Sequence, residues 1–306
     1  EIIFGLKMKS DIEYMKKPNF FQLKNKYFLY YPFYSIFDKK TKDYDVRIAN
    51  QGTPDLPANV VYIQTNMYNR KVLRFRKLLR LYYGIKGNPK IVISVSSYTA
   101  KTIKDVYGLD SLVIHPPVNV EEFLPISNKS HDKNIVLTLA RLHPSKKLDF
   151  IIKVAKELPE LSFIILVTAS DFQYLTYLNS LIKELNVKNV EIKPNLPKTE
   201  LLEIMSNAKL YLHPPFEEPN SLSVVESMAA GLIPVVYKKG GTWSDVVSKI
   251  DQNLGYDNID EAKSAIYYGL ENRERLRPLI IEEAKKHSVS NFEEQFIAVV
   301  KSKAVL

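Results

Sequence analysis

The feature that most constrains the fold is an alternation of short apolar runs with longer helical patterns, which starts near residue 132. The runs are rich in Val, Ile and Leu, and the segments between them repeat apolar residues at helical spacing. Buried parallel strands separated by helices are typical of this pattern. The sequence therefore predicts a doubly wound α/β domain. Its predicted strands are residues 135–140, 162–167, 189–193, 210–213 and 233–237, and its predicted helices are residues 148–158, 172–185, 198–208 and 221–231.

The chain before residue 116 shows a weaker form of the same pattern. The predicted strands there are residues 44–50, 59–64, 90–96 and 111–115, with a predicted helix over 97–108. Two adjacent prolines and a polar run over 116–134 predict a linker. Beyond residue 271 the pattern predicts two amphipathic helices with a break between 287 and 291. We therefore expect an N-terminal domain over 1–117, a second domain over 118–286, and a C-terminal helix over 287–306 that can cross back to the first domain.

Composition excludes several classes of protein. The 306 residues contain no Cys, which excludes disulfides, thiolate catalysis, Cys-based zinc sites and iron–sulfur clusters, and fits a cytoplasmic setting. None of the 5 His has metal-ligand spacing with another, so we expect no metal site and a structural or surface role for all of them. The sequence has no P-loop and no GxGxxG motif, which argues against an ATPase or a nicotinamide dehydrogenase. Every apolar run is shorter than the roughly 18 residues that span a bilayer.

The net charge of +9 is unevenly distributed along the chain. Residues 1–120 hold 20 Lys and Arg against 9 Asp and Glu, whereas residues 121–306 hold 23 against 25. This asymmetry favours an acidic partner for the first part, either nucleic acid, anionic lipid or a phosphorylated substrate.

Many of these basic residues fall in residues 69–86, which predict a basic amphipathic helix. Such a helix can lie on an anionic membrane, with contacts expected from Arg74, Arg76, Lys77 and Arg80. A helix that packs on the core and exposes a solvated basic face explains the pattern equally well. RNA binding is the least favoured interpretation, since the segment carries no nucleic-acid motif.

The most informative segment is residues 213–236, where Glu218 and Glu226 stand eight positions apart between a strand end and a helix. Ligands of open α/β sheets bind at the carboxyl ends of the strands. There the N–H groups of Asn220, Ser221 and Leu222 at the helix start would form an anion site suited to a phosphate. In the alternative interpretation, Glu218 only caps the helix and Glu226 only faces solvent.

This segment resembles the E-x7-E motif of retaining glycosyltransferases of family 4, which have the GT-B fold of two Rossmann-like domains facing each other across a cleft. Further segments resemble the family in the same order along the chain: residues 93–108, 113–123, 136–158 and 238–247. The resemblance covers about residues 44–300.

The resemblance implies a role for each matching residue. Arg141 and Lys146 would hold the pyrophosphate of a nucleotide-sugar donor and neutralise its charge as it leaves. Lys147 stands where the family often has Gly, so either lysine can be the acting one. Glu218 would bind the transferred hexose and Glu226 the ribose, with Asn220, Ser221 and Leu222 at the donor phosphates. The fold needs no metal and no cofactor besides the donor.

Three departures from the family pattern stand out. Asn220 and Ser221 replace the common Phe-Gly pair, which keeps the N–H donors but loses the freedom of Gly. No Gly-rich loop precedes residue 44, so we expect the first strand and loop of the N-terminal, acceptor-side domain to be absent or to precede Glu1. Gln64 occupies the position of a His near the reacting sugar, where it can contact a hydroxyl but cannot transfer a proton.

Together the residues and the resemblance predict a retaining, metal-independent glycosyltransferase. It would move a hexose of the mannose or glucose type from a nucleotide-diphosphate sugar to a lipid-linked, glycan or other acceptor. We expect it in the cytoplasm, peripheral to the inner membrane face. The alternative is a non-catalytic, degenerate GT-B protein that binds a sugar nucleotide or nucleic acid; the missing loop and Gln64 favour it.

Overall fold

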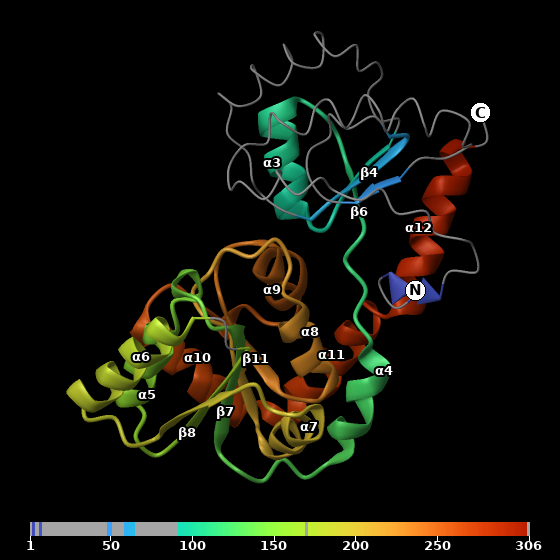
Figure 1. Cartoon of the computed structure of the whole chain (residues 1–306). Coiled ribbons are helices and arrows are strands. Elements are labelled where there is room, and N and C mark those ends of the chain that lie inside the picture. Colours follow the sequence, from blue (N-terminus) through green and yellow to red (C-terminus); the bar gives the residue numbers. More distant parts are fainter. Residues whose placement is uncertain are drawn as a thin grey trace. The chain divides into compact units, whose positions relative to one another are not determined.

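The computed structural model describes residues 2–3, 6–7, 48–50, 58–64, 91–168 and 171–304 (Figure 1). The chain divides into two compact units. Unit 1 comprises Glu1–His115 and Glu293–Leu306, and unit 2 comprises Pro116–Phe292. The boundaries expected from the sequence are 117 and 286.

Unit 2 is built on a six-stranded parallel sheet with the order β12-β11-β10-β7-β8-β9. Its strands are β7 (Ile135–Arg141), β8 (Ser162–Thr168), β9 (Val190–Pro194), β10 (Leu210–Leu212), β11 (Ile233–Tyr237) and β12 (Gly255–Tyr256). The five strands predicted for this domain are confirmed, and β12 is an additional short edge strand. The order reverses between β7 and β10, which makes this point the topological switch where doubly wound folds bind ligands.

Helices cover both faces of this sheet (Figure 1). One face carries α5 (Leu148–Lys156), α6 (Phe172–Glu184) and α10 (Ile259–Glu271), with α5 packed against both of the others. The other carries α4 (Val120–Phe123), α8 (Leu222–Ala229) and α11 (Arg273–Lys285), with α7 (Lys198–Asn207) and α9 (Ser248–Ile250) nearby. Amphipathic spacing explains the helices: α5 buries Leu148, Ile151 and Ile152, and α8 buries Val224, Val225 and Met228.

The segment over 116–134 differs from the predicted linker. It contains α4 and a 3-10 turn over Leu124–Asn128. Val120, Phe123 and Ile126 are buried in the core of unit 2. These apolar side chains pack the segment against unit 2. Its two prolines and polar residues predict only a loop and do not indicate this packing.

Unit 1 contains a four-stranded parallel sheet of β3 (Ile48–Asn50), β4 (Val60–Ile63), β5 (Ile91–Ser94) and β6 (Leu112–Val113). Helix α3 (Ser97–Tyr107) begins at the Ser96 cap and ends at Gly108, whose φ of 69° is left-handed. A separate antiparallel pair joins β1 (Ile2–Ile3) to β2 (Leu6–Lys7).

The C-terminal helix α12 (Val289–Ala304) follows α11, and the break between these two helices at 286–288 lies close to the predicted one. The Phe296 ring of α12 packs edge-on against Tyr62 of β4, with the ring centroids 6.2 Å apart, so this part of the helix belongs to unit 1. Within the described residues, no helix has both the length and the apolar character needed to cross a bilayer.

Candidate active site

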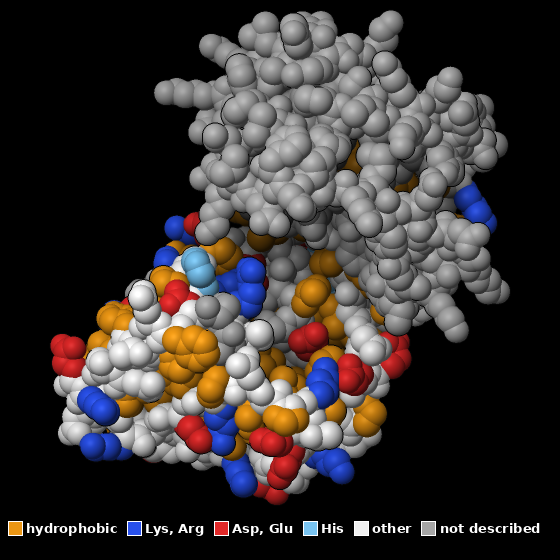
Figure 2. Space-filling model, viewed as in Figure 1, with side chains coloured by type: hydrophobic (Ala, Val, Ile, Leu, Met, Phe, Trp, Pro, Cys, Tyr) orange, Lys and Arg blue, Asp and Glu red, His pale blue; other side chains and the backbone are white. Residues whose placement is uncertain are grey.

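A cavity of about 630 Å³ opens at the topological switch point of unit 2. Figure 2 shows basic and acidic side chains close together, among apolar ones, on the visible face of this unit. Every site residue that the sequence predicts in unit 2 lines the cavity: Arg141, Lys146, Glu218, Asn220, Ser221, Leu222 and Glu226. Residues far apart in the chain meet because β7 and β10 are neighbours in the sheet.

The other predicted contacts fall elsewhere. Gln64 directly follows β4 in unit 1 and is half-buried. The four basic residues of the predicted membrane helix, Arg74, Arg76, Lys77 and Arg80, lie outside the described residues.

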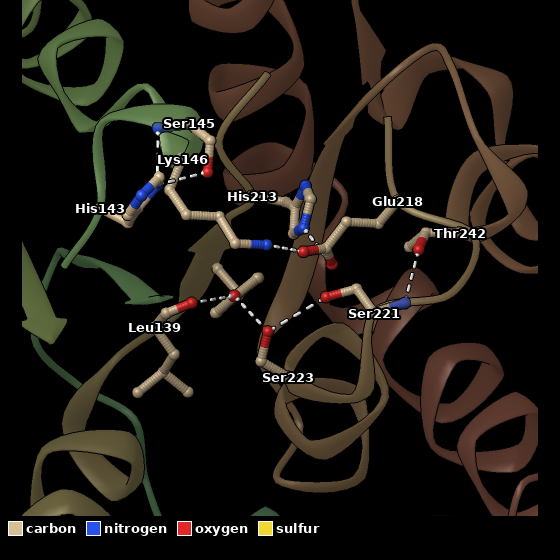
Figure 3. A network of polar contacts seen from close by, with 10 residues as sticks. Leu139, His143, Ser145, Lys146, His213, Glu218, Ser221, Ser223 and Thr242 are labelled. Carbon is tan, nitrogen blue, oxygen red and sulfur yellow. Dashed lines mark hydrogen bonds and ion pairs between the residues drawn. The ribbon is translucent and has the colours of Figure 1, made fainter. Parts of the chain in front are cut away.

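Lys146 reaches the cavity because of the turn that follows β7. Strand β7 ends at Arg141, and a 3-10 turn over Pro144–Lys146 begins at His143, whose Nδ1 accepts the Ser145 N–H at 3.2 Å (Figure 3). Lys147 adopts a left-handed φ of 50° and is exposed, which explains why Gly suits this position. The lysine that lines the cavity is Lys146.

The ammonium of Lys146 is partly desolvated. Its Nζ contacts Glu218 Oε1 and lies 4.3 Å from the centroid of the Phe216 ring. Burial, followed by repulsion from Arg141, lowers the pKa of Lys146 to about 8. Because the two cations lie on one side of the cavity, that side suits an anion.

Glu218 is held at both carboxylate oxygens (Figure 3). Oε1 contacts Lys146, and Oε2 lies 3.3 Å from Nε2 of His213. The side chain therefore contacts Lys146 and His213, whereas the helix-cap interpretation requires it to contact the first turn of α8. Its backbone carbonyl accepts the N–H of Gly241 at 2.9 Å, which joins the loop of Gly240 and Gly241 to the site.

Glu226 lies on α8, half-buried in the wall of the cavity. Burial raises the pKa of its carboxyl group, and the nearby Lys198 partly offsets this effect. Glu226 is therefore a half-buried residue of the cavity wall rather than a fully exposed one.

The start of α8 differs from the predicted phosphate site in one respect. Ser221 is the N-cap residue, and its N–H donates to Thr242 Oγ1 at 2.8 Å. Its hydroxyl joins a chain of hydrogen bonds through Ser223 and Tyr211 to the carbonyl of Leu139 (Figure 3). A phosphate at this helix start must therefore displace Thr242 to use the Ser221 N–H.

Gly240 fixes the loop that carries Thr242. Its φ of +89° favours glycine, and an added Cβ would lie 3.0 Å from the Glu218 nitrogen and closer still to the Glu218 carbonyl oxygen. The absence of a side chain at Gly240 therefore lets the loop pack against the backbone of Glu218.

Replacing Gly240 by Ala should destabilise unit 2 and displace Glu218. Gly108 is the matched control, because its φ is +69° but, its chain neighbours aside, no atom of the described residues lies within 4 Å of an added Cβ. We expect Gly108→Ala to lower the free energy of unfolding by about 1–2 kcal/mol, which is the cost of a left-handed φ. Gly240→Ala should lower it by about 1–3 kcal/mol more than that, because its Cβ also overlaps the backbone of Glu218. Urea unfolding measures both, and equal losses would contradict the close packing of the loop.

Two further residues belong to the site although the sequence pattern did not indicate them. His213, treated as structural, is 5% exposed, lines the cavity and contacts Glu218. Its position directly after β10 at the switch point is the signal that could have identified it. Thr242 gives no local signal, since its contact with Ser221 joins positions 21 apart in the chain. Within the described part of the chain, no group of three or more His, Asp or Glu could hold a metal ion.

Comparison with known proteins decides the family. The sequence profile of the glycosyl transferases group 1 family matches residues 119–287, which is more than half of the chain. The chain belongs to this family. The matched segment contains every predicted site residue of unit 2.

Two similar curated relatives each have the name GDP-Man:Man(3)GlcNAc(2)-PP-Dol alpha-1,2-mannosyltransferase. The Dictyostelium discoideum protein is 26% identical over 270 residues, covering 79% of this chain and 54% of the relative. The Xenopus laevis protein is 29% identical over 259 residues, covering 78% and 53%. The chain thus spans about half the length of these relatives.

Solved structures show the same fold. Anabaena HepE in complex with UDP aligns with a TM-score of 0.69 at 16% identity, covering 89% of this chain and 82% of that one. A glycosyltransferase from Rickettsia africae aligns with a TM-score of 0.70 at 14% identity, covering 93% and 84%. The prediction of a GT-B fold with two Rossmann-like domains is confirmed.

Proposed function

We propose that this chain is a retaining glycosyltransferase of family 4 that transfers a hexose from a nucleotide-diphosphate sugar bound in the cavity of unit 2. The observation that carries the proposal is the convergence of Arg141, Lys146, Glu218 and Glu226 on one cavity at the switch point. Two cations and two carboxylates in one cavity suit a ligand with an anionic centre and several hydroxyls.

In this proposal, Arg141 and Lys146 bind the pyrophosphate and stabilise the charge that develops as it leaves. Glu218 accepts hydrogen bonds from hydroxyls of the transferred sugar, and Glu226 from the ribose. The leaving phosphate assists attack of the acceptor on the same face of the sugar, so no protein nucleophile is required. Donor binding must open the contact between Lys146 and Glu218.

We further propose a mannosyl donor and a lipid-linked acceptor. The names of the curated relatives support this choice, since they specify GDP-mannose and a dolichol-linked oligosaccharide. The second candidate function is sugar-nucleotide binding without catalysis. It is supported by Gln64, half-buried after β4 where the family resemblance places a His.

A lipid-linked acceptor would place the protein at the cytoplasmic face of a membrane, with the basic residues of 69–86 facing anionic lipid. Each Lys or Arg near such a surface contributes about 1 kcal/mol. Changing Arg74, Arg76, Lys77 and Arg80 together to Gln should therefore release the protein from sedimenting anionic vesicles at low salt. Equal sedimentation of the variant would contradict the membrane contact but not the enzymatic proposal.

Binding of a nucleoside diphosphate should weaken as the pH rises through about 8. Lys146 has a pKa of about 8, so it carries its charge below this pH and loses it above. Neutral Lys146 no longer gives a charged hydrogen bond, so affinity for the diphosphate should fall by up to about 10- to 150-fold. The fall should end at the pKa of Lys146 in the complex, which is higher than in the free protein. Calorimetry across this range measures the effect, and Lys146→Arg is the control that stays charged and should flatten the profile. A flat profile for the parent protein would contradict the role of Lys146.

Thermal unfolding with a panel of nucleotides and nucleotide sugars tests donor binding. A ligand at 100 times its Kd should add about 2.7 kcal/mol of stability. The shift should persist in EDTA, because Arg141, Lys146 and the start of α8 supply the positive field without a metal. A shift that EDTA abolishes would overturn the metal-independent site.

A further inference from the structure

The backbone of His213 is fixed on two sides. Its N–H donates to the Val235 carbonyl at 2.9 Å, and its own carbonyl accepts the hydroxyl of Tyr256. Only 5% of the residue is exposed. The ring therefore has little freedom, and the group that its Nε2 faces is Oε2 of Glu218, at 3.3 Å.

The chemistry of His213 and Glu218 indicates which ring nitrogen of His213 carries the hydrogen. An ionised carboxylate can only accept hydrogen bonds, so Nε2 must carry the hydrogen for this contact to be a hydrogen bond. Burial, followed by the charge of Lys146, lowers the pKa of His213 to about 3, although a hydrogen bond to the backbone of Pro214 opposes this shift, and the ring is neutral near pH 7. The ring is then a neutral donor to Glu218, and it leaves the negative charge of the carboxylate available.

The two partners of Glu218 differ in what donor binding would do to them. Lys146, on Oε1, is the residue that would turn toward the pyrophosphate. His213, on Oε2, carries no charge and is fixed by β11 and by Tyr256. Its contact with Glu218 can persist when Lys146 leaves.

We propose that His213 is a positioning residue that holds the Glu218 carboxylate toward the transferred sugar once Lys146 has moved to the donor phosphates. This inference rests on the proposed function of the cavity. Because the sugar contact is used as charge develops at the anomeric carbon, the loss of His213 should lower kcat rather than donor affinity.

Two substitutions separate a positioning role from packing. His213→Leu removes the donor and keeps an apolar side chain of similar reach, and it should lower kcat by about 10- to 100-fold. His213→Gln places an amide N–H near the former Nε2 and should restore most of that loss. Affinity for the bare nucleoside diphosphate should be unchanged in both. Failure of Gln to rescue, or an equal loss of diphosphate affinity, would overturn the proposal.

A double-mutant cycle completes the test. In a Glu218→Gln background, His213→Leu should cost much less than in the parent, because the contact has already been changed. Equal costs in both backgrounds would mean that His213 acts independently of Glu218, against the proposal.

Histidine side-chain ¹⁵N spectra give a readout that needs no turnover and covers the case of a poorly folded Leu variant. The parent should show the Nε2–H tautomer at neutral pH, with an Nε2 shift that changes in Glu218→Gln. The opposite tautomer, or an unchanged shift, would overturn the inference. If the parent shows this contact but turns over no nucleotide sugar, the proposed function fails instead.

Discussion

Replacing Lys146 by Ala should lower the turnover of a nucleotide sugar by about 100- to 1,000-fold. This is the loss expected when one preorganised group that stabilises developing charge is removed from an active site. Lys146 lines the cavity, is partly desolvated, and lies close enough to Arg141 for the two charges to repel each other. Arg141→Ala should cause a loss of the same order, and a nucleotide-release assay measures both.

Lys147 provides the matched control for this experiment. It is the adjacent lysine, but it is exposed and adopts the left-handed φ of 50°. Lys147→Gly should therefore retain turnover and relieve backbone strain. If this variant loses as much activity as Lys146→Ala, the assignment of Lys146 over Lys147 is wrong.

Glu226→Ala and Glu218→Ala should fail in different ways. A hydrogen bond to a charged group contributes about 1.5–3 kcal/mol, so Glu226→Ala should weaken the bare nucleoside diphosphate by roughly 10- to 150-fold. Glu218→Ala should not weaken it, because Lys146 loses its ion-pair partner and stays available for phosphate. Glu218→Ala should instead lower turnover, since in the proposed function its carboxylate would hold hydroxyls of the sugar in the transition state.

Calorimetry with the diphosphate, together with nucleotide release by folded variants, distinguishes these outcomes. If both variants bind and turn over like the parent, neither carboxylate contacts the donor. If Glu218→Ala weakens the diphosphate as much as Glu226→Ala does, the division of sugar and ribose between them is wrong.

The order of strands and helices in unit 2 could be predicted because local periodicity encodes it. The apolar runs at 135–140 and 162–167 became β7 and β8 within one residue. Strand β12 was missed, since it has only two residues and gives no periodic signal. The linker prediction was incomplete because it rested on prolines, which restrict the backbone but say nothing about burial. Phe123 and Ile126 are buried in the core of unit 2, and this burial orders the segment.

The candidate site was predicted from a family resemblance more than from spacing. Spacing alone left Glu218 and Glu226 as a helix cap and a surface residue. The contact of Lys146 with Glu218 joins positions 72 apart, and it depends on β10 lying beside β7, which no local pattern gives. The same is true of the Ser221 contact with Thr242.

The central claim is that the cavity of unit 2 binds the donor of an active glycosyltransferase. Its most direct test is the release of GDP from GDP-mannose by the purified protein, with and without a lipid-linked or glycan acceptor. We expect release that rises with acceptor, persists in EDTA, yields a product with the anomeric configuration of the donor, and is lost in Lys146→Ala. Release that Lys146→Ala leaves unchanged, or no release from any nucleotide sugar that binds, would contradict it.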